Sequence, residues 1–173
     1  MRALFILAFI ANLVLGVVSL VILPSRVAIH FGSGGVANNW SSSYFNTFFF
    51  VGVNTFLFLV LYFTPRLVFT LPAKWINLPN KDYWLRPENK TRTVEMFSSF
   101  MYEFGAALFL FLFTVQVITI RANLSQPVRL DEKLFLFALG LFLFYTVYWC
   151  IKFFKAFRHP REAEDAHGPY NLC

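Results

Sequence analysis

The sequence predicts an all-α membrane protein, a bundle of four transmembrane helices with both termini in the cytoplasm. Three observations lead to this class. Of the 173 residues, 58% are hydrophobic and only 14% are charged, and the mean hydropathy is +0.59. A soluble domain carries about 25% charged residues and needs more polar surface than this chain offers. The apolar residues gather in four long runs, and most basic residues fall in alternate segments between them.

The first predicted span covers residues 3–23. It contains no charge and is long enough for a hydrocarbon core of about 30 Å. Arg2 precedes it as in a signal peptide, but the run is too long for a typical h-region and no small-x-small cleavage site follows, so we expect an uncleaved helix that ends at Pro24. Small and polar side chains recur on one face, which predicts close packing against another helix: Ala8, Asn12, Gly16 and Ser19.

The second predicted span covers residues 44–63 and has Asn54 near its middle, as the first span has Asn12. A side-chain amide in hydrocarbon needs a hydrogen-bond partner. We therefore predict an interhelical hydrogen bond between these two amides.

Residues 64–93 are predicted as a polar, aromatic connection that lies partly along the membrane surface. Its prolines exclude a continuous helix: Pro65, Pro72, Pro79 and Pro87. Trp75, Tyr83 and Trp84 suit the head-group level of the bilayer. Pro87 suits a first helical turn, with Glu88 at the positive end, so a helix that begins there would continue into the third span.

The third predicted span covers residues 97–120 and the fourth covers residues 133–157. The third contains Gln116 and Glu103, the only acid inside an apolar run. A functional role in the bundle interior is one interpretation of Glu103; structural hydrogen bonding, or solvation at the interface, is the other. Residues 1–157 thus form one transmembrane domain, and residues 158–173 form a polar cytoplasmic tail.

The basic residues predict the orientation. Eleven of the 15 lysines and arginines fall on one side of the predicted membrane: Arg2, Arg66, Lys74, Lys81, Arg86, Lys90, Arg92, Lys152, Lys155, Arg158 and Arg161. Only four fall on the other side: Arg26, Arg121, Arg129 and Lys133. The positive-inside rule places the richer side, with both termini, in the cytoplasm and the first loop outside.

The first outer loop, residues 24–43, combines turn residues with a histidine and a large aromatic. His30 has no second His, Cys or acid near it at ligand spacing, so we favour a hydrogen-bonded His that shapes the loop over a metal ligand. A recognition role is the other interpretation left open. Residues 32–35 are predicted as a turn rather than a dinucleotide site, because we expect no strand before them and no amphipathic soluble helix after them.

No catalytic set emerges from the sequence, and we expect neither a cofactor nor a metal site. The net charge of +6 is interpreted as loop charge facing the inner leaflet rather than as a nucleic-acid surface. The lipid bilayer is the first partner that the sequence predicts.

Two motifs resemble a bacterial membrane family of unknown function, represented by the N-terminal part of the SdpI-type immunity proteins. The outer loop has the Leu-Pro helix end, the His-Phe pair, the Gly-rich turn and the tryptophan of that family: Pro24, His30, Phe31, Gly35 and Trp40. Ala28 stands where many members have a second proline, and Asn38 and Asn39 stand where many have Asp-Gly. A second motif, in residues 76–85, is similar to a subset of the family: Asn77, Pro79, Asp82, Tyr83 and Trp84.

The resemblance covers roughly residues 1 to 120, and the fourth helix is similar in position only. Members with a demonstrated role are immunity proteins against a secreted toxin and carry a further C-terminal domain. The resemblance implies a protein of the bacterial inner membrane, and a patterned outer loop without catalytic groups predicts that it is not an enzyme. We expect an immunity, sensing or accessory protein that binds another membrane or secreted protein through its outer loop.

Two alternatives are left open. One is a small-ligand or lipid-handling membrane protein, possibly an enzyme, that uses Glu103 together with Asn12, Asn54 and Tyr102. The other is a structural subunit of a larger membrane complex.

Overall fold

The computed structural model of the chain describes residues 1–158, so the predicted tail, apart from Arg158, lies outside the described residues. Its long helices are α1 (Arg2–Ile22), α2 (Ser43–Val68), α4 (Pro87–Leu124) and α5 (Glu132–Arg158). Each is long and apolar enough to cross a membrane, which indicates a multi-pass membrane protein. The shorter elements are β1 (Arg26–Phe31), η1 (Ser33–Gly35), β2 (Ala37–Ser42), η2 (Ala73–Trp75) and α3 (Lys81–Trp84).

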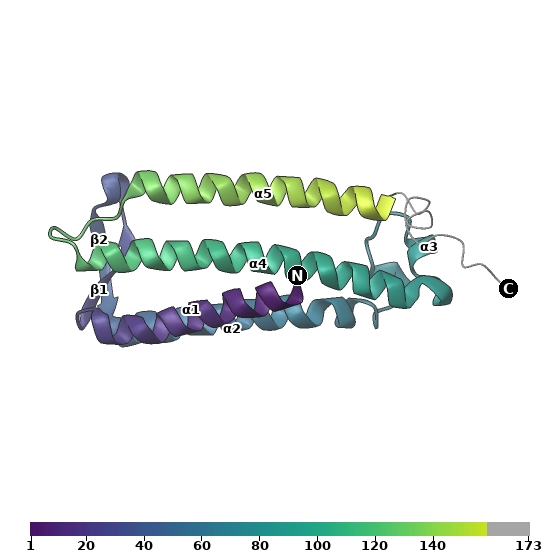
Figure 1. Cartoon of the computed structure of the whole chain (residues 1–173), viewed down its shortest axis with the longest axis horizontal. Helices are drawn as coiled ribbons and strands as arrows, with labels where there is room; N and C mark the ends of the chain where they lie inside the picture. The colour runs from purple at the N-terminus through teal and green to yellow at the C-terminus, as the bar shows by residue number, and fades with distance from the viewer. Residues whose placement is uncertain (159–173) are drawn as a thin grey trace.

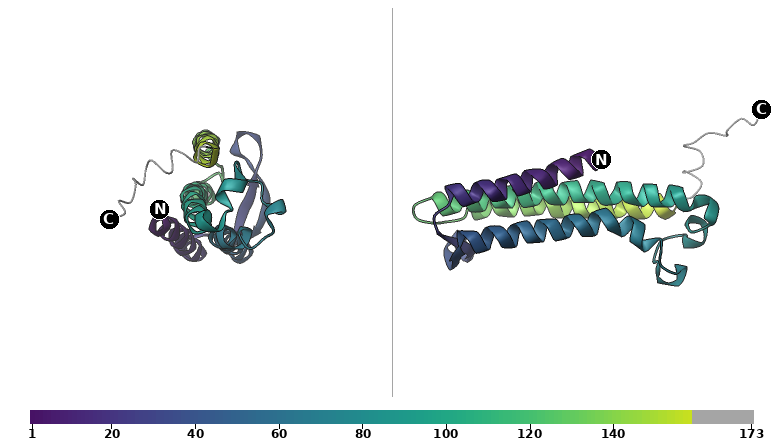
Figure 2. Two further views of the ribbon diagram at one scale, coloured as in Figure 1. Left: turned by 90° about the vertical axis from the view of Figure 1, so that its right-hand side faces the viewer. Right: turned by 90° about the horizontal axis from the view of Figure 1, so that it is seen from below.

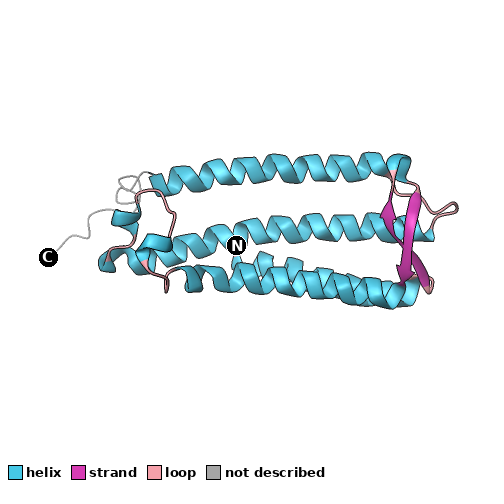
Figure 3. Ribbon diagram, turned by 180° about the vertical axis from the view of Figure 1, so that it is seen from behind, coloured by secondary structure: helices cyan, strands magenta, loops and turns pink. Residues whose placement is uncertain are grey.

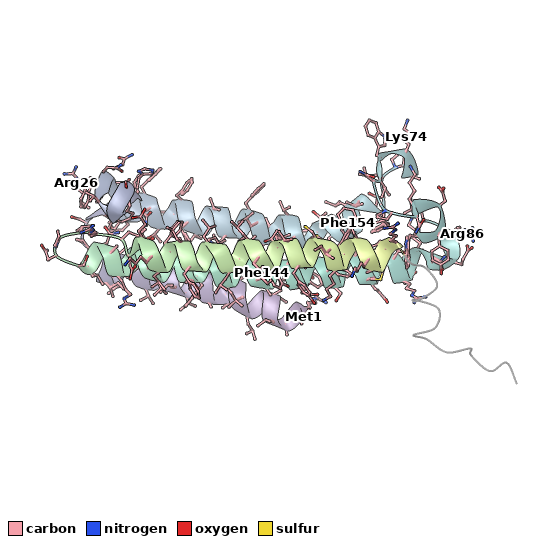
Figure 4. All side chains as sticks on the ribbon, turned by 90° about the horizontal axis from the view of Figure 1, so that it is seen from above. Met1, Arg26, Lys74, Arg86, Phe144 and Phe154 are labelled. Atoms are coloured by element: carbon pink, nitrogen blue, oxygen red, sulfur yellow. The ribbon has the colours of Figure 1, made fainter. Side chains whose placement is uncertain are left out.

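The long helix α4 lies at the centre of the arrangement. Helices α1 and α2 pack against each other and against α4, whereas α5 packs mainly against α4 (Figures 1 and 2). The β-strands lie at one end of the helices and α3 lies at the other. Much of α5, including Phe144 and Phe154, therefore presents apolar side chains to the outside (Figure 4).

The predicted helix boundaries are correct at some ends and wrong at others. Helix α4 begins at Pro87, as predicted, and extends well beyond the predicted third span. Helix α2 continues through Pro65 to Val68, so the prediction that the connection begins at residue 64 is wrong. Pro65 lies within the last turns of the helix, where its missing N–H removes one backbone hydrogen bond, and its ring is buried.

The all-α prediction is wrong for the first outer loop, which contains a two-stranded β-hairpin. Strands β1 and β2 pair antiparallel, and the register is irregular between Ala28 and Phe31. The hairpin crosses the end of the helices (Figure 3). A strand therefore does precede residues 32–35, but the predicted turn is confirmed: Gly34 and Gly35 have φ angles of 71° and 75°, which favour glycine.

The small and polar face of α1 is the buried face, as predicted: its buried residues are Phe5, Ala8, Asn12, Gly16 and Ser19. Phe5 is fully buried and packs against Tyr102, Ala106 and Phe109 of α4. A Cβ atom at Gly105 would lie only 2.4 Å from the Phe5 ring, so this glycine permits the close approach of α1 and α4.

The connection between α2 and α4 forms a second apolar core with the end of α5. Trp84, predicted at the head-group level, is instead fully buried and donates a hydrogen bond from Nε1 to the Phe157 carbonyl at 2.7 Å. Trp75 is 72% exposed, as expected of a residue at that level. The buried members of this core come from the connection, from α4 and from α5: Phe69, Ile76, Leu78, Trp84, Phe100 and Phe157.

Candidate functional site

The hairpin is attached to α4 by a side-chain amide that acts like a neighbouring strand. Asn123, near the end of α4, accepts a hydrogen bond from the Ala28 N–H at 2.6 Å and donates one to the Ala28 carbonyl at 3.1 Å. Both residues are buried. The pairing satisfies both backbone polar groups of Ala28, which would be costly to bury without partners.

The turn of the hairpin is attached to the loop between α4 and α5. The Leu130 N–H donates to the Gly35 carbonyl at 2.8 Å, and Arg129 Nε donates to the Gly34 carbonyl at 2.6 Å. The Gly34 N–H in turn donates to the Glu132 carboxylate at 2.9 Å. The loop between α1 and α2 and the loop between α4 and α5 therefore form one structure, which we call the cap: residues 24–42 and 125–132.

The cap exposes a mixed apolar and polar surface. Ile29, Val36 and Trp40 are exposed hydrophobic side chains, and the Arg26 guanidinium lies 5.7 Å from the Trp40 ring centroid, within range of a cation–π contact. Arg26 lies at the end of the molecule opposite Lys74 and Arg86 (Figure 4). We call this surface, together with the exposed His30, Asn38 and Asn39, the hairpin surface.

His30 is hydrogen-bonded within the hairpin. Its Nδ1 lies 2.6 Å from Asn38 Oδ1, across the turn. Within residues 1–158, no group of three His, Cys, Asp or Glu side chains could hold a metal ion. The contact with Asn38 favours the interpretation in which His30 shapes the loop, and its exposure leaves the ring available to a partner.

The other predicted residues of the outer loop have different positions. Pro24 is exposed between α1 and β1, and Phe31 is half-buried at the end of β1. Gly35 is buried, and a Cβ there would lie 2.1 Å from the Leu130 carbonyl oxygen. Gly35 therefore contributes to the shape of the cap rather than to its exposed surface.

The predicted hydrogen bond between Asn12 and Asn54 is wrong. Asn12 Nδ2 donates to the Ala8 and Phe109 carbonyls, both at 2.8 Å, and Asn54 Nδ2 donates to the Phe50 carbonyl at 2.9 Å. Both side-chain oxygens lack a partner, so neither amide accepts from the other. The backbone satisfies the donors because a carbonyl one turn earlier is always within reach.

The two amides nevertheless lie at one level of the α1–α2 interface. Ser19 Oγ lies 3.1 Å from Thr47 Oγ1, and Asn12 and Asn54 each stand two turns from that contact on antiparallel helices. Gln116 of α4 also has a buried side-chain oxygen without a partner. Polar groups thus line the interface between α1, α2 and α4.

Glu103 is paired with a residue that sequence reasoning missed. Lys152 Nζ lies 2.7 and 2.8 Å from the two Glu103 oxygens, and the Tyr145 hydroxyl donates to the carboxylate at 3.3 Å. Lys152 lies inside the predicted fourth span, and a cation within an apolar run was the available signal. Tyr102 instead packs against Phe5 of α1 and Glu103 binds α5, so the contacts do not unite Glu103 with Asn12, Asn54 and Tyr102.

An apolar groove of about 370 Å³ lies between α4 and α5. Its lining includes Ala107 and Phe111 of α4 and Phe137 and Ala138 of α5. Tyr145, which donates to Glu103, also lines it. The groove therefore has mainly apolar walls, with Thr114 and Tyr145 as its polar side chains.

The second predicted motif fastens the connection to α4 and α5. Besides the Trp84 contact, Thr93 Oγ1 donates to the Trp84 carbonyl at 2.8 Å and Asn89 Nδ2 donates to the Tyr83 carbonyl at 2.9 Å. Asn80 Nδ2 donates to the Arg158 carbonyl. Asn77 and Asp82 are exposed and Pro79 is half-buried, so Trp84 and Tyr83 supply the structural contacts of this motif.

The fold and the cap define a mostly helical, multi-pass membrane protein whose first loop is a fastened β-hairpin. The family model of a domain of unknown function (DUF1648) matches residues 7–55, which include most of α1, the whole hairpin and half of α2. No curated protein and no solved structure matches the chain.

Proposed function

We propose that this chain is a non-enzymatic membrane protein that recognises another membrane or secreted protein through the hairpin surface. The observation that carries the proposal is the construction of the cap. Side chains from α4 and from the following loop fix the hairpin, while Ile29, Val36 and Trp40 stay exposed. A fixed surface that mixes aromatic, apolar and amide groups suits protein recognition, because little conformational freedom is lost on binding.

The proposal includes a location and an orientation. The four helices form a bundle in a bacterial inner membrane, with both termini in the cytoplasm and the cap outside. The distribution of Lys and Arg supports this orientation. A soluble reporter fused after residue 173 should be cytoplasmic, and an external reporter would contradict the orientation.

The resemblance to the SdpI-type immunity proteins supports a role in immunity or sensing. The match of residues 7–55 to a domain of unknown function covers the hairpin on which that resemblance rests. An exposed hairpin that binds a secreted toxin, or a membrane protein that reports it, is compatible with this role.

The test uses purification in mild detergent followed by mass spectrometry of the bound proteins. We expect a stoichiometric partner that Trp40→Ala and His30→Ala each weaken by tenfold or more after reconstitution from pure components. Trp75→Ala is the control, because it removes another exposed tryptophan, from the opposite end of the molecule. Equal loss in the control, or full binding by both hairpin variants, would contradict the proposal.

A lipid-handling role is the second candidate, and the groove between α4 and α5 favours it. Its apolar walls suit an acyl chain, and Tyr145 connects it to Glu103 and Lys152. A lipid that copurifies with the wild-type chain and is lost in Ala138→Trp, which fills the groove, would support this function. Unchanged lipid content in that variant would exclude it.

A further inference from the structure

A polar recess lies at the ends of α1 and α2 that are farther from the cap. It has a volume of about 380 Å³ and is bounded by the start of α1, the end of α2 and one face of α4. The hairpin surface takes no part in it, and neither does the groove at α5. Its lining contains two guanidinium groups and three hydroxyl groups: Arg2, Arg66, Ser98, Ser99 and Tyr102. It also contains one carboxylate, that of Glu95.

Two arginines of this recess are held around one aromatic ring. The guanidinium carbons of Arg2 and Arg66 lie 5.4 and 5.3 Å from the centroid of the Tyr62 ring. Arg2 Nη2 also donates to the Tyr62 hydroxyl at 2.7 Å. Two guanidinium groups held around one ring form a positively charged surface, which favours an anionic ligand.

Neither guanidinium forms an ion pair within residues 1–158. The ion pair in that part of the chain joins Glu103 to Lys152 instead. Each guanidinium therefore keeps N–H donors free for a ligand. A guanidinium matches the two oxygens of a phosphate in a bidentate pair, and Ser99 adds a hydroxyl donor on the same wall, whereas the Ser98 hydroxyl donates to the Val94 carbonyl at 2.6 Å. The chemistry of this lining is that of a phosphate site.

The recess lies where a lipid head group would be found. Arg2 is the first residue of α1, directly before its apolar run, and Arg66 is in the last turn of α2. Met1 lies short of Arg86 along the long axis, so α4 continues past the recess (Figure 4). Basic residues at the ends of spans occupy the head-group layer of the bilayer.

Glu95 makes a purely anionic ligand less favourable, because its carboxylate lies on the same lining. A zwitterionic head group removes the conflict: its phosphate lies between Arg2 and Arg66 while its ammonium lies at Glu95. We propose that this recess binds the phosphoethanolamine head group of a phospholipid, in the leaflet on the side away from the cap. The inference goes beyond the proposed function and does not depend on it.

The test measures lipid binding to the purified full chain by native mass spectrometry. We expect phosphatidylethanolamine to bind at least tenfold more tightly than diacylglycerol of the same acyl chains, and more tightly than phosphatidylglycerol. Equal binding of diacylglycerol would overturn the phosphate assignment, and tighter binding of phosphatidylglycerol would overturn the role of Glu95. Displacement of the lipid by free phosphoethanolamine at equal concentration would overturn the lipid as the source of the phosphate.

Variants separate a specific site from general basic charge. Arg2→Gln with Arg66→Gln should lower phosphatidylethanolamine binding at least tenfold, whereas Arg26→Gln with Arg121→Gln, which removes the same charge at the other end, should leave it unchanged. Equal loss in both pairs, or no loss in the first, would overturn the site.

Two further variants test the site with substitutions that are milder than the loss of both arginine charges. Arg2→Lys with Arg66→Lys keeps both charges but removes the bidentate forks, and should weaken binding at least threefold. Glu95→Gln should lower phosphatidylethanolamine binding to the level of phosphatidylglycerol. Wild-type behaviour of either variant would overturn the part of the proposal that it tests.

Discussion

Gly35 is the residue on which the shape of the cap depends most directly. Its φ angle of 75° is one that residues with a side chain rarely adopt, and its carbonyl accepts from the Leu130 N–H. Position 35 requires glycine for two separate reasons: the positive φ angle, and the lack of space for a Cβ atom beside Leu130.

We therefore predict that Gly35→Ala destabilises the protein by about 1–3 kcal/mol. The new Cβ would lie 2.1 Å from the Leu130 carbonyl oxygen, so the hairpin turn and the loop between α4 and α5 must separate. Thermal unfolding in detergent and the rate of proteolysis within residues 24–42 would measure the change. Gly52→Ala, where a Cβ meets nothing within 4 Å, is the control and should behave as wild type; an equal effect of both substitutions would contradict this explanation.

For single residues, the sequence predicts the role of a side chain better than it predicts which residue that side chain contacts. His30 could be predicted to shape the loop, because its neighbours are turn residues and no metal ligand stands near it. Asn123 could not be predicted as the attachment point of the hairpin. Its partner, Ala28, is 95 residues away and contributes only backbone atoms, which no sequence pattern marks.

The interface between α1 and α2 shows what a polar residue contributes within a pair of helices. Asn12 forms a bond to another helix, at the Phe109 carbonyl, whereas the Asn54 bond to Phe50 stays within its own helix. The two amides therefore differ in what they add to helix association, although they occupy equivalent places in their helices.

We predict that Asn12→Leu lowers the free energy of unfolding by about 0.6–1.7 kcal/mol, since it removes a bond between α1 and α4. Asn54→Leu should leave it unchanged or raise it, because it removes a buried oxygen without a partner. Unfolding in mixed detergent micelles would measure both. A larger loss in Asn54→Leu than in Asn12→Leu would contradict the assignment of these bonds.

Hydropathy predicts the four long helices because a helix that spans a membrane needs a long run of apolar residues. It does not predict the hairpin, since β2 contains Asn38, Asn39 and two serines and has no apolar alternation. Nor does it predict that α2 passes through Pro65, where packing around a buried ring overrides the local preference.

For the whole molecule, the position of α5 depends mainly on its contacts with α4. The pair formed by Glu103 and Lys152 is one of them, and it lies near the end of α5 that Trp84 also holds. Towards the cap the two helices leave the groove between them. Helix α5 is thus the least embedded of the long helices, with none of its apolar stretch buried.

We predict that Glu103→Gln loosens α5 and lowers the free energy of unfolding by about 1 kcal/mol, a modest value because Lys152 is 42% exposed. Lys152→Gln should have a similar effect, and the double variant should be no worse than either single one. Distances between spin labels on α4 and α5, with unfolding measurements, would check this. Additive losses in the double variant would show that the pair contributes no coupling.

The attachment of the cap also fixes an order of events during synthesis. Ala28 cannot form its hydrogen bonds until Asn123 has been made, and Gly34 cannot form its own until Arg129 and Glu132 have been made. These partners emerge from the ribosome some 95 to 98 residues later. At about 5–20 residues per second this interval lasts on the order of 5–20 s. The hairpin is thus synthesised early and remains unattached until α4 and the loop that follows it have been made. The cap is therefore completed only after residue 132 has been added, although its strands end at residue 42.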